Sequence, residues 1–318
     1  MPDTKLAKTS LDDRSTDPAT DLAVTADPVS GEARSLWSDA WHSLRRNPVF
    51  LISSVAVMFI IAIAVVPGLF TDVSPRQADL ANHYLQRPHY THFFQGDWLG
   101  YDGQGRSIYA RILYGARISV IVSVGATITV TLLGSVVGML AGYFGGWIDA
   151  VLSRITDIFL GVPFLLGALV MLSMMEKRSV WVVTGVIAAL AWTQIARVMR
   201  GSVLTVKQAD YVAAARALGA GTSRILVRHI MPNAVAPVIV VATLALGGFI
   251  VTEAYLSFLG LGVQAPSISW GGDISAASND IRIAPHTLFV PSVMLSITVL
   301  SFIMLGEAVR DALDPKLR

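Results

Sequence analysis

Six long apolar segments limit what this chain can fold into more than any other feature of its 318 residues. The first of them carries no charged side chain from Val49 to Phe70. At about 1.5 Å per residue, a helix of that length crosses a hydrocarbon layer about 30 Å thick. Charged residues make up only 14% of the chain, against about a quarter in soluble domains. The predicted spans are Val49–Phe70, Ile118–Gly142, Ile158–Met175, Ser179–Ala196, Ala234–Thr252 and Thr287–Gly306.

These segments predict an all-α membrane protein that crosses the bilayer with six transmembrane helices. The Lys and Arg residues are unevenly divided between the two sides that this topology creates. Sixteen of the 24 lie on the side of the N-terminus, and eight lie on the other side. Loops rich in Lys and Arg remain in the cytoplasm. The bias therefore predicts that the N-terminus and the C-terminus are both cytoplasmic.

The segments around the spans differ in composition. The polar leader has no apolar periodicity, which is typical of a disordered cytoplasmic tail. After it, Trp37 and Trp41 share one face of a predicted helix with a basic end, as in helices at the membrane interface; an ordinary linker is the alternative. The predicted parts are the tail 1–34, the interfacial helix 35–47, and the transmembrane domain 48–318, with outer loops 71–117 and 262–286 and a cytoplasmic loop 197–232.

Three glycines in the second predicted span recur at every fourth position. Gly134, Gly138 and Gly142 therefore lie on one face of the helix. Small residues at this spacing allow the backbone of a second helix to approach closely. We interpret these glycines as a packing surface between helices, without a further functional role.

The loop 197–232 is the most ordered of the predicted connections. It contains the stretch Asp210-Tyr-Val-Ala-Ala-Ala-Arg-Ala-Leu-Gly219 and ends at Pro232. Gly219 accommodates φ > 0 and can end a first short helix. Thr222 or Ser223 can cap a second short helix, which Pro232 is expected to stop. An Ala-rich connection without a partner is the alternative reading of the composition.

The same loop resembles the coupling loop of ATP-binding-cassette (ABC) importer permeases, Glu-Ala-Ala-x3-Gly-x9-Ile-x-Leu-Pro. Three other stretches are similar to the dipeptide, oligopeptide and nickel branch of that family. They are Asp97–Arg106, which precedes the second predicted span, Thr252–Gly262, which ends the fifth, and Leu305–Pro315 near the C-terminus. Together the four matches cover roughly residues 97–318, and the chain resembles the C-type permease of a dipeptide-type system.

The resemblance implies the ABC type I importer permease fold and a non-catalytic membrane subunit of a larger complex in the bacterial plasma membrane. The implied partners are a second homologous permease, two cytoplasmic ATPase subunits that bind ATP and Mg²⁺, an extracytoplasmic substrate-binding protein, and the lipid bilayer. The implied cargo is a dipeptide, an oligopeptide, a nickel complex or a related small solute. The residues implied in ATPase coupling are Asp210, Ala213, Ala214, Ala215, Arg216, Gly219, Arg224, Arg228, His229 and Pro232.

The chain departs from the family pattern within the coupling loop. The family glutamate is Ala213 here, the isoleucine is His229, and the leucine is Met231. An ion pair to an ATPase through the first position is therefore in doubt. The shape that the alanines, Gly219 and Pro232 give to the loop is expected to remain.

Several kinds of chemistry have no residues to support them. The chain has no cysteine, which excludes disulfides and thiolate catalysis. It has no phosphate-binding loop, because Gly219-Ala-Gly-Thr222 lacks the lysine. We therefore expect no catalytic residue and no cofactor in this chain, and nothing indicates a nucleic-acid partner.

Few ionisable side chains lie near the predicted membrane interior. Glu253 lies at the end of the fifth predicted span, where an interfacial or packing role is favoured over a place on the translocation path. His89 and His92 lie in the predicted outer loop, but two histidines alone make a weak metal site, so we expect none. An ATP-independent secondary transporter or channel is the alternative function. It would need membrane-embedded charges, inverted repeats or a selectivity filter.

Overall fold

The computed structural model describes residues 41–313. The predicted disordered tail, residues 1–34, lies outside the described residues, as do residues 35–40 of the predicted interfacial helix 35–47. Of the remaining residues 41–47, residues 41–44 are helical, and Trp41 is exposed. No β-strand is present among residues 41–313, which agrees with the prediction of an all-α chain.

Five continuous helices in the described part of the chain are long and apolar enough to cross a membrane. Four of them correspond to predicted spans: three are longer than predicted, and the first ends at Val65, before the predicted end at Phe70. The fifth joins three consecutive elements, α9 (Thr222–Arg224), the π-helical turn η2 (Ile225–Ile230) and α10, into one helix over Thr222–Phe258. The long helices are α2 (Pro48–Val65), α4 (Ile108–Phe144), α7 (Val180–Val206), α10 (Met231–Phe258) and α12 (His286–Leu313).

The predicted span Ile158–Met175 is not a straight helix. It is divided between α5 (Gly146–Gly161) and α6 (Phe164–Ser173), whose axes meet at 82°. Val162 has extended torsions, φ −83° and ψ 118°, because the ring of Pro163 disfavours the helical conformation of the residue before it. The described chain thus has six spans when this bent pair is counted as one span.

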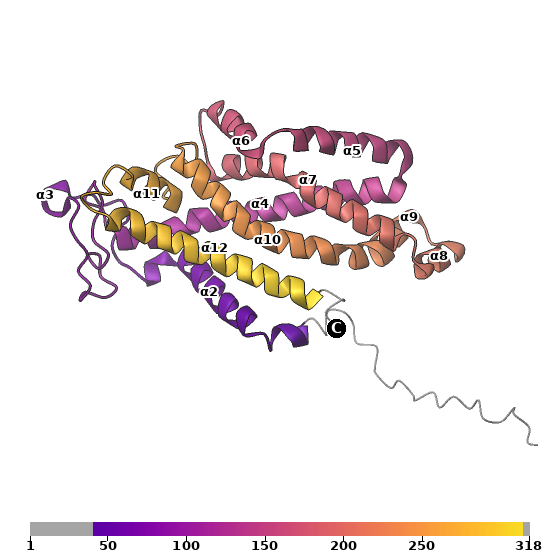
Figure 1. The fold of residues 1–318 in the computed structure, drawn as a ribbon, viewed down its shortest axis with the longest axis horizontal. Coiled ribbons are helices and arrows are strands. Elements are labelled where there is room, and N and C mark those ends of the chain that lie inside the picture. The colour runs from indigo at the N-terminus through magenta and orange to yellow at the C-terminus, as the bar shows by residue number, and fades with distance from the viewer. Residues whose placement is uncertain (1–40, 314–318) are drawn as a thin grey trace, which may run out of the picture. The chain divides into compact units, whose positions relative to one another are not determined.

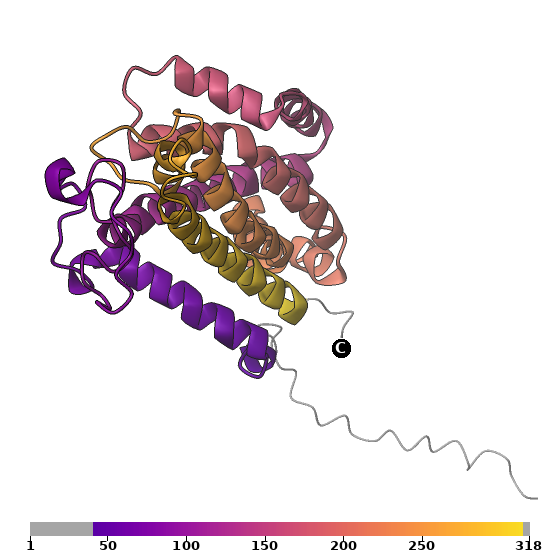
Figure 2. The same ribbon diagram turned by 60° about the vertical axis from the view of Figure 1, so that its left-hand side comes forward.

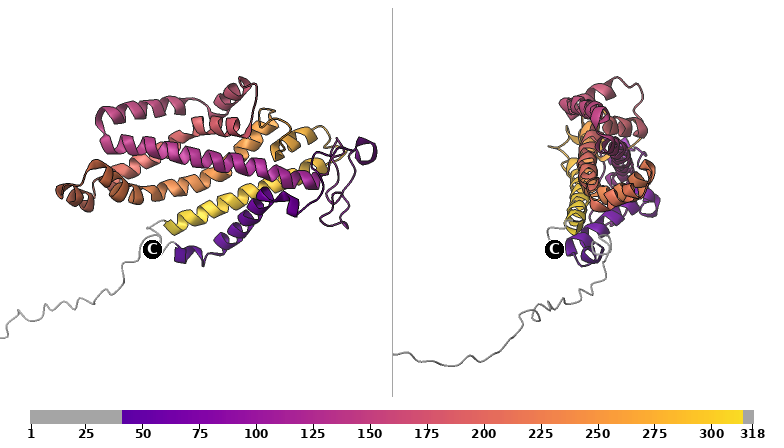
Figure 3. Two further views of the ribbon diagram at one scale, coloured as in Figure 1. Left: turned by 180° about the vertical axis from the view of Figure 1, so that it is seen from behind. Right: turned by 90° about the vertical axis from the view of Figure 1, so that its right-hand side faces the viewer.

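The long helices lie side by side, and α4 runs through the bundle from one end to the other (Figures 1 and 3). It packs against α7, α10 and α2, while α12 packs between α10 and α2 (Figure 2). The bent pair lies outside this group, with α5 and α6 both against α7. Buried aliphatic side chains from α4, α6, α7 and α10 form the largest core cluster.

The face of α4 with the three glycines lies against α7. A Cβ atom added at Gly138 would collide with the carbonyl oxygen of Ala196 and would lie 2.8 Å from Cβ of Met199. Added Cβ atoms at Gly134 and Gly142 would meet α7 at 2.7 Å and 2.9 Å. The two helix backbones are therefore close enough to contact each other only because these positions have no side chain.

The short elements gather at the two ends of the bundle. At one end, which we call the α8 end, lie α8 (Asp210–Ala217) and α9, with the first turn of α2 and the last turn of α12 (Figure 1). At the opposite end, the α3 end, lie η1 (Pro67–Leu69), α3 (Leu80–His83) and α11 (Trp270–Ala277), as the rear view also shows (Figure 3). The predicted coupling loop and the predicted outer loops thus lie at opposite ends.

Candidate functional site

The helix α8 projects from the α8 end of the bundle (Figure 1). Asp210 occupies its first turn and Arg216 its last, an arrangement in which each charge complements the helix dipole. One side chain, Val212, is fully buried and packs into the main core. Val212 therefore anchors α8 to the bundle, and most of the remaining surface of α8 is exposed to contact.

Half of the ten residues predicted for the coupling interface lie on α8, and four of these five are exposed. Ala213, Ala214 and Arg216 are exposed, whereas Ala215 is half-buried because it lies on the same side as Val212. Two large side chains that the sequence reading left out extend the exposed surface: Tyr211 and Leu218, the second 88% exposed. These exposed apolar groups are available for contact with another surface. We call Asp210, Tyr211, Ala213, Ala214, Arg216 and Leu218 the α8 surface.

The turn after α8 is built around Gly219. Its φ is +80°, in the region that glycine adopts without strain. The amide of Gly219 donates to the carbonyl of Arg216 at 3.0 Å, and the amide of Ala220 donates to Ala215 at 3.1 Å. These two bonds close a Schellman motif, which fixes the direction in which the chain leaves α8.

Two predictions about the second part of the loop are wrong. Gly221, not Thr222 or Ser223, precedes the helix, and no side chain caps it. Pro232 does not stop the helix, which continues to Phe258. A proline ring would clash with a carbonyl in a regular α-helix. The π-helical turn η2 lies directly before α10, and a turn of this kind changes the hydrogen-bond register where a proline must fit.

The other predicted coupling residues lie along this second helix. Arg224, Arg228 and Pro232 are exposed, and His229 is half-buried. Because η2 packs against α8, these side chains and the α8 surface belong to the same end of the molecule. Their position is consistent with one continuous contact region.

The base of the loop is held by polar contacts to the preceding helices. Lys207 donates to the carbonyl oxygen of Tyr143 at 2.5 Å, with its Nζ 5.6 Å from the centre of the Tyr143 ring. About two turns earlier, Arg200 forms a bidentate pair with Asp149, and both N–O distances are 2.6 Å. These contacts join the end of α7 to α4 and α5, so α8 leaves the bundle from a fixed base.

Glu253 occupies a different environment from the predicted span end. It is fully buried, because α10 continues past it to Phe258 and α11 covers this part of the helix. Its carboxyl oxygens accept hydrogen bonds from Ser119 of α4 and Ser257 of α10, each at 2.7 Å. In this conformation Glu253 connects helices. A role on the translocation path stays a prediction.

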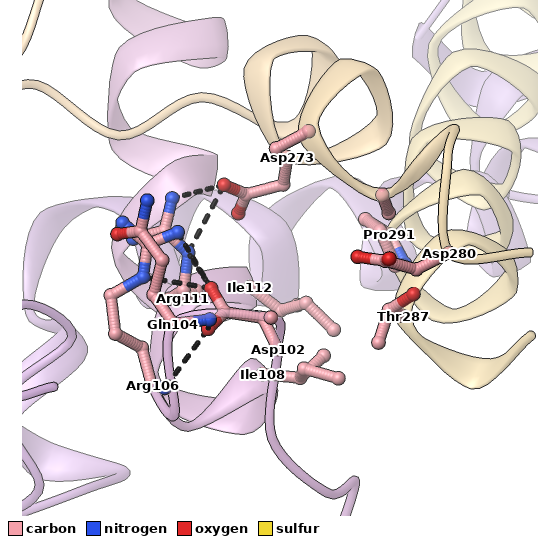
Figure 4. Close-up of a pocket in the computed structure, with 13 residues that line it drawn as sticks. Asp102, Gln104, Arg106, Ile108, Arg111, Ile112, Asp273, Asp280, Thr287 and Pro291 are labelled. Carbon is pink, nitrogen blue, oxygen red and sulfur yellow. Dashed lines mark hydrogen bonds and ion pairs between the residues drawn. The ribbon is translucent and has the colours of Figure 1, made fainter. Parts of the chain in front are cut away.

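A polar cavity of about 190 Å³ lies at the α3 end between α4, α11 and α12. Figure 4 shows the arginine side chains on one side of it and Asp280 and Thr287 on the other. Nε of Arg111 donates to Asp273 at 3.0 Å, and Nε of Arg106 donates to Asp102 at 2.7 Å. The resemblance pointed to the segment with Asp102 and Arg106, but not to the pair that Arg111 of α4 forms with Asp273 of α11.

The chain matches known transport families over most of its length. The family described as "Binding-protein-dependent transport system inner membrane component" matches residues 134–318, more than half of the chain. A second family, "N-terminal TM domain of oligopeptide transport permease C", matches residues 35–88. The two matches together include α2, the last third of α4 and every described helix after it.

Individual relatives agree with these families. The oligopeptide transport system permease protein OppC of Bacillus subtilis (strain 168) is 36% identical over 95% of this chain and 97% of its own. The glutathione transport system permease protein GsiD of Pectobacterium atrosepticum is 36% identical over 90% of this chain and 93% of its own.

A solved structure, the inward-facing MetNI methionine ABC transporter, has the same fold with a TM-score of 0.52 and 19% identity, over 64% of this chain and 96% of that one. The chain therefore belongs to the binding-protein-dependent transport system inner membrane components and is a non-catalytic, multi-pass permease subunit of an ABC importer, a type of subunit that works with ATPase and substrate-binding partners.

Proposed function

We propose that this permease carries short peptides into the cell and that the α8 surface receives the movement of the ATPase subunits. The substrate class is supported by the two relatives described above, which are named for oligopeptides and for glutathione, itself a peptide. The coupling role is supported by the geometry of α8.

The complex that we propose has a second, homologous permease, two cytoplasmic ATPase subunits and an extracytoplasmic binding protein that delivers the peptide. ATP and Mg²⁺ bind to the ATPase subunits and not to this chain, since the sequence contains no phosphate-binding loop. The α8 end is the cytoplasmic end in this arrangement, and both termini lie on the same side.

The observation that carries the coupling role is the continuity of the helix from Thr222 to Phe258. The Schellman turn at Gly219 fixes α8 to the start of this helix. A displacement of the α8 surface is therefore transmitted along a stiff element to Glu253 and to α11, which packs on α10. A loop that ended at Pro232, as the sequence suggested, would have had a flexible joint at that position.

Co-purification with the ATPase subunits tests the α8 surface directly. Leu218→Asp and Ala214→Asp each place a charge on the exposed side of α8 without touching the core. Burying an unpaired charge in an interface costs several kcal/mol, roughly 3–5. We expect both variants to insert into the membrane normally and to lose most of the bound ATPase and of the transport activity.

Thr222→Ala is the control within the same loop, because Thr222 is exposed and makes no capping bond. It should retain ATPase binding. If Leu218→Asp and Ala214→Asp both bind the ATPase subunits and transport as the wild type does, the α8 surface is not the coupling site. The peptide assignment is tested separately, by mass spectrometry of the ligand that the co-purified binding protein carries.

A further inference from the structure

Three side chains with metal-binding atoms converge in the segment between α3 and α4. The rings of His89 and His92 stack, with centroids 5.3 Å apart and an angle of 16° between their planes. Nδ1 of His92 lies 2.7 Å from Oδ2 of Asp97. One candidate ligand atom from each residue lies within 4.8 Å of the other two. The sequence showed only the pair His89 and His92, and the fold adds Asp97 as a third ligand.

The backbone already holds these three residues together. The amide of His89 donates to the carbonyl oxygen of Asp97 at 3.1 Å, and the amide of His92 donates to His89 at 3.0 Å. The first of these bonds closes the segment from His89 to Asp97 into a loop. A metal ion that binds here meets a chain that is already ordered. The entropic cost of binding is therefore smaller.

The loop is also fixed to the body of the protein on both sides of Asp97. Before it, the hydroxyl group of Ser107 donates to the carbonyl oxygen of Gly96 at 2.5 Å. After it, the ring of Trp98 packs against those of Phe94 and Tyr109, with centroid distances of 5.1 Å and 5.4 Å. Tyr109 belongs to α4, so the carboxyl group is positioned by a transmembrane helix.

The three side chains include one negative charge, which favours the binding of a cation. Aspartate side chains ionise well below neutral pH, so Asp97 supplies a carboxylate anion to the cluster. His89 and His92 are exposed, so an ion reaches the site directly from the solvent.

Two imidazoles and one carboxylate suit divalent ions of intermediate softness, such as Zn²⁺, and not Mg²⁺ or Ca²⁺, which prefer oxygen ligands alone. With metal–ligand bonds of about 2.0–2.2 Å, the ligand atoms of a tetrahedral site lie about 3.3 Å apart. His92 and Asp97 would separate slightly around the ion, and His89 would turn toward it. The remaining position would hold water.

We propose that His89, His92 and Asp97 form a binding site for one divalent transition-metal ion at the α3 end of the permease. The ion would join the two ends of the 89–97 loop by coordination in addition to the existing backbone bond. This site is independent of the α8 surface and of the peptide assignment, and it serves no catalytic step.

The test uses ZnCl₂ and the full-length chain, purified with an affinity tag that contains no histidine. Isothermal titration calorimetry measures the stoichiometry and the dissociation constant for Zn²⁺. Co²⁺ supplies a second readout, since coordination by imidazole gives visible absorption bands. The variants are His89→Gln, His92→Gln and the nearly isosteric Asp97→Asn. His83→Gln is the matched control, because His83 stacks on Tyr101 outside the cluster.

We expect the wild type and His83→Gln to bind one Zn²⁺ per chain, and each of the three cluster variants to bind at least about tenfold more weakly. Circular dichroism confirms that each variant retains its helices. A wild type that binds no Zn²⁺, or cluster variants that bind it as tightly as the wild type, would overturn the proposal.

Discussion

Ser119 of α4 donates its hydroxyl hydrogen to Glu253 of α10, with 2.7 Å between Oγ and Oε2, although the two residues are 134 positions apart in the sequence. Both side chains are fully buried. Because the other carboxyl oxygen accepts from Ser257, the glutamate satisfies two hydroxyl groups inside the bundle. This contact joins α4, which packs on α7, to the helix that begins next to α8.

Replacement of Glu253 tests how strongly this contact stabilises the bundle. Glu253→Ala leaves a cavity and two buried hydroxyl groups without their acceptor, so we expect it to lower the free energy of unfolding by roughly 2–5 kcal/mol. Glu253→Gln keeps the volume and one carbonyl oxygen and should cost less than about 1.5 kcal/mol. Thermal unfolding of the purified permease in detergent measures both. Equal midpoints for Glu253→Ala and the wild type would show that the contact does not stabilise the fold.

The same method tests the glycine contact between α4 and α7. Gly138→Ala adds a Cβ atom that would collide with the Ala196 carbonyl oxygen, so the helices must separate, at a cost of roughly 1–3 kcal/mol. Gly185→Ala is the matched control, because an added Cβ on this face of α7 meets nothing within 4 Å. This substitution should leave the free energy of unfolding unchanged or raise it by up to about 1 kcal/mol, since alanine has a higher helix propensity than glycine. Similar losses for both variants would contradict the close packing at Gly138.

The turn after α8 contains two glycines, Gly219 and Gly221. Alanine substitutions at these two positions test whether the direction of the turn matters for coupling. Gly219→Ala forces alanine to φ +80° and should cost about 1–2 kcal/mol in backbone strain. Gly221 has φ −67°, which any residue adopts, so Gly221→Ala should have almost no effect. ATPase binding and peptide uptake are the readouts. We expect both to fall only in Gly219→Ala; equal activity of the two variants would mean that the direction of the turn is unimportant for coupling.

The orientation of the chain is testable because it contains no cysteine. Gln104 near the α3 end and Thr222 near the α8 end are both exposed. In intact cells, an impermeant thiol reagent should label Gln104→Cys but not Thr222→Cys. After the membrane is opened, both should react. The opposite pattern would place the α8 surface outside the cell and would contradict the coupling role.

Some features of this protein followed from the sequence alone, because they depend on residues close together in the chain. Long uncharged runs such as Val49–Phe70 predicted membrane helices, since length and apolar composition are local properties. The spacing of Gly134, Gly138 and Gly142 placed them on one helix face for the same reason. The positive φ at Gly219 was expected, because only glycine adopts that torsion without strain.

Other features were decided by the tertiary structure. The helix continues through Pro232 because the π-helical turn before it changes the hydrogen-bond register. Glu253 is buried because a serine from a distant helix and the cover of α11 complete its surroundings. Asp97 joins His89 and His92 because the chain folds back on itself. Such contacts depend on how helices and loops pack in space, and no local pattern of residues specifies that packing.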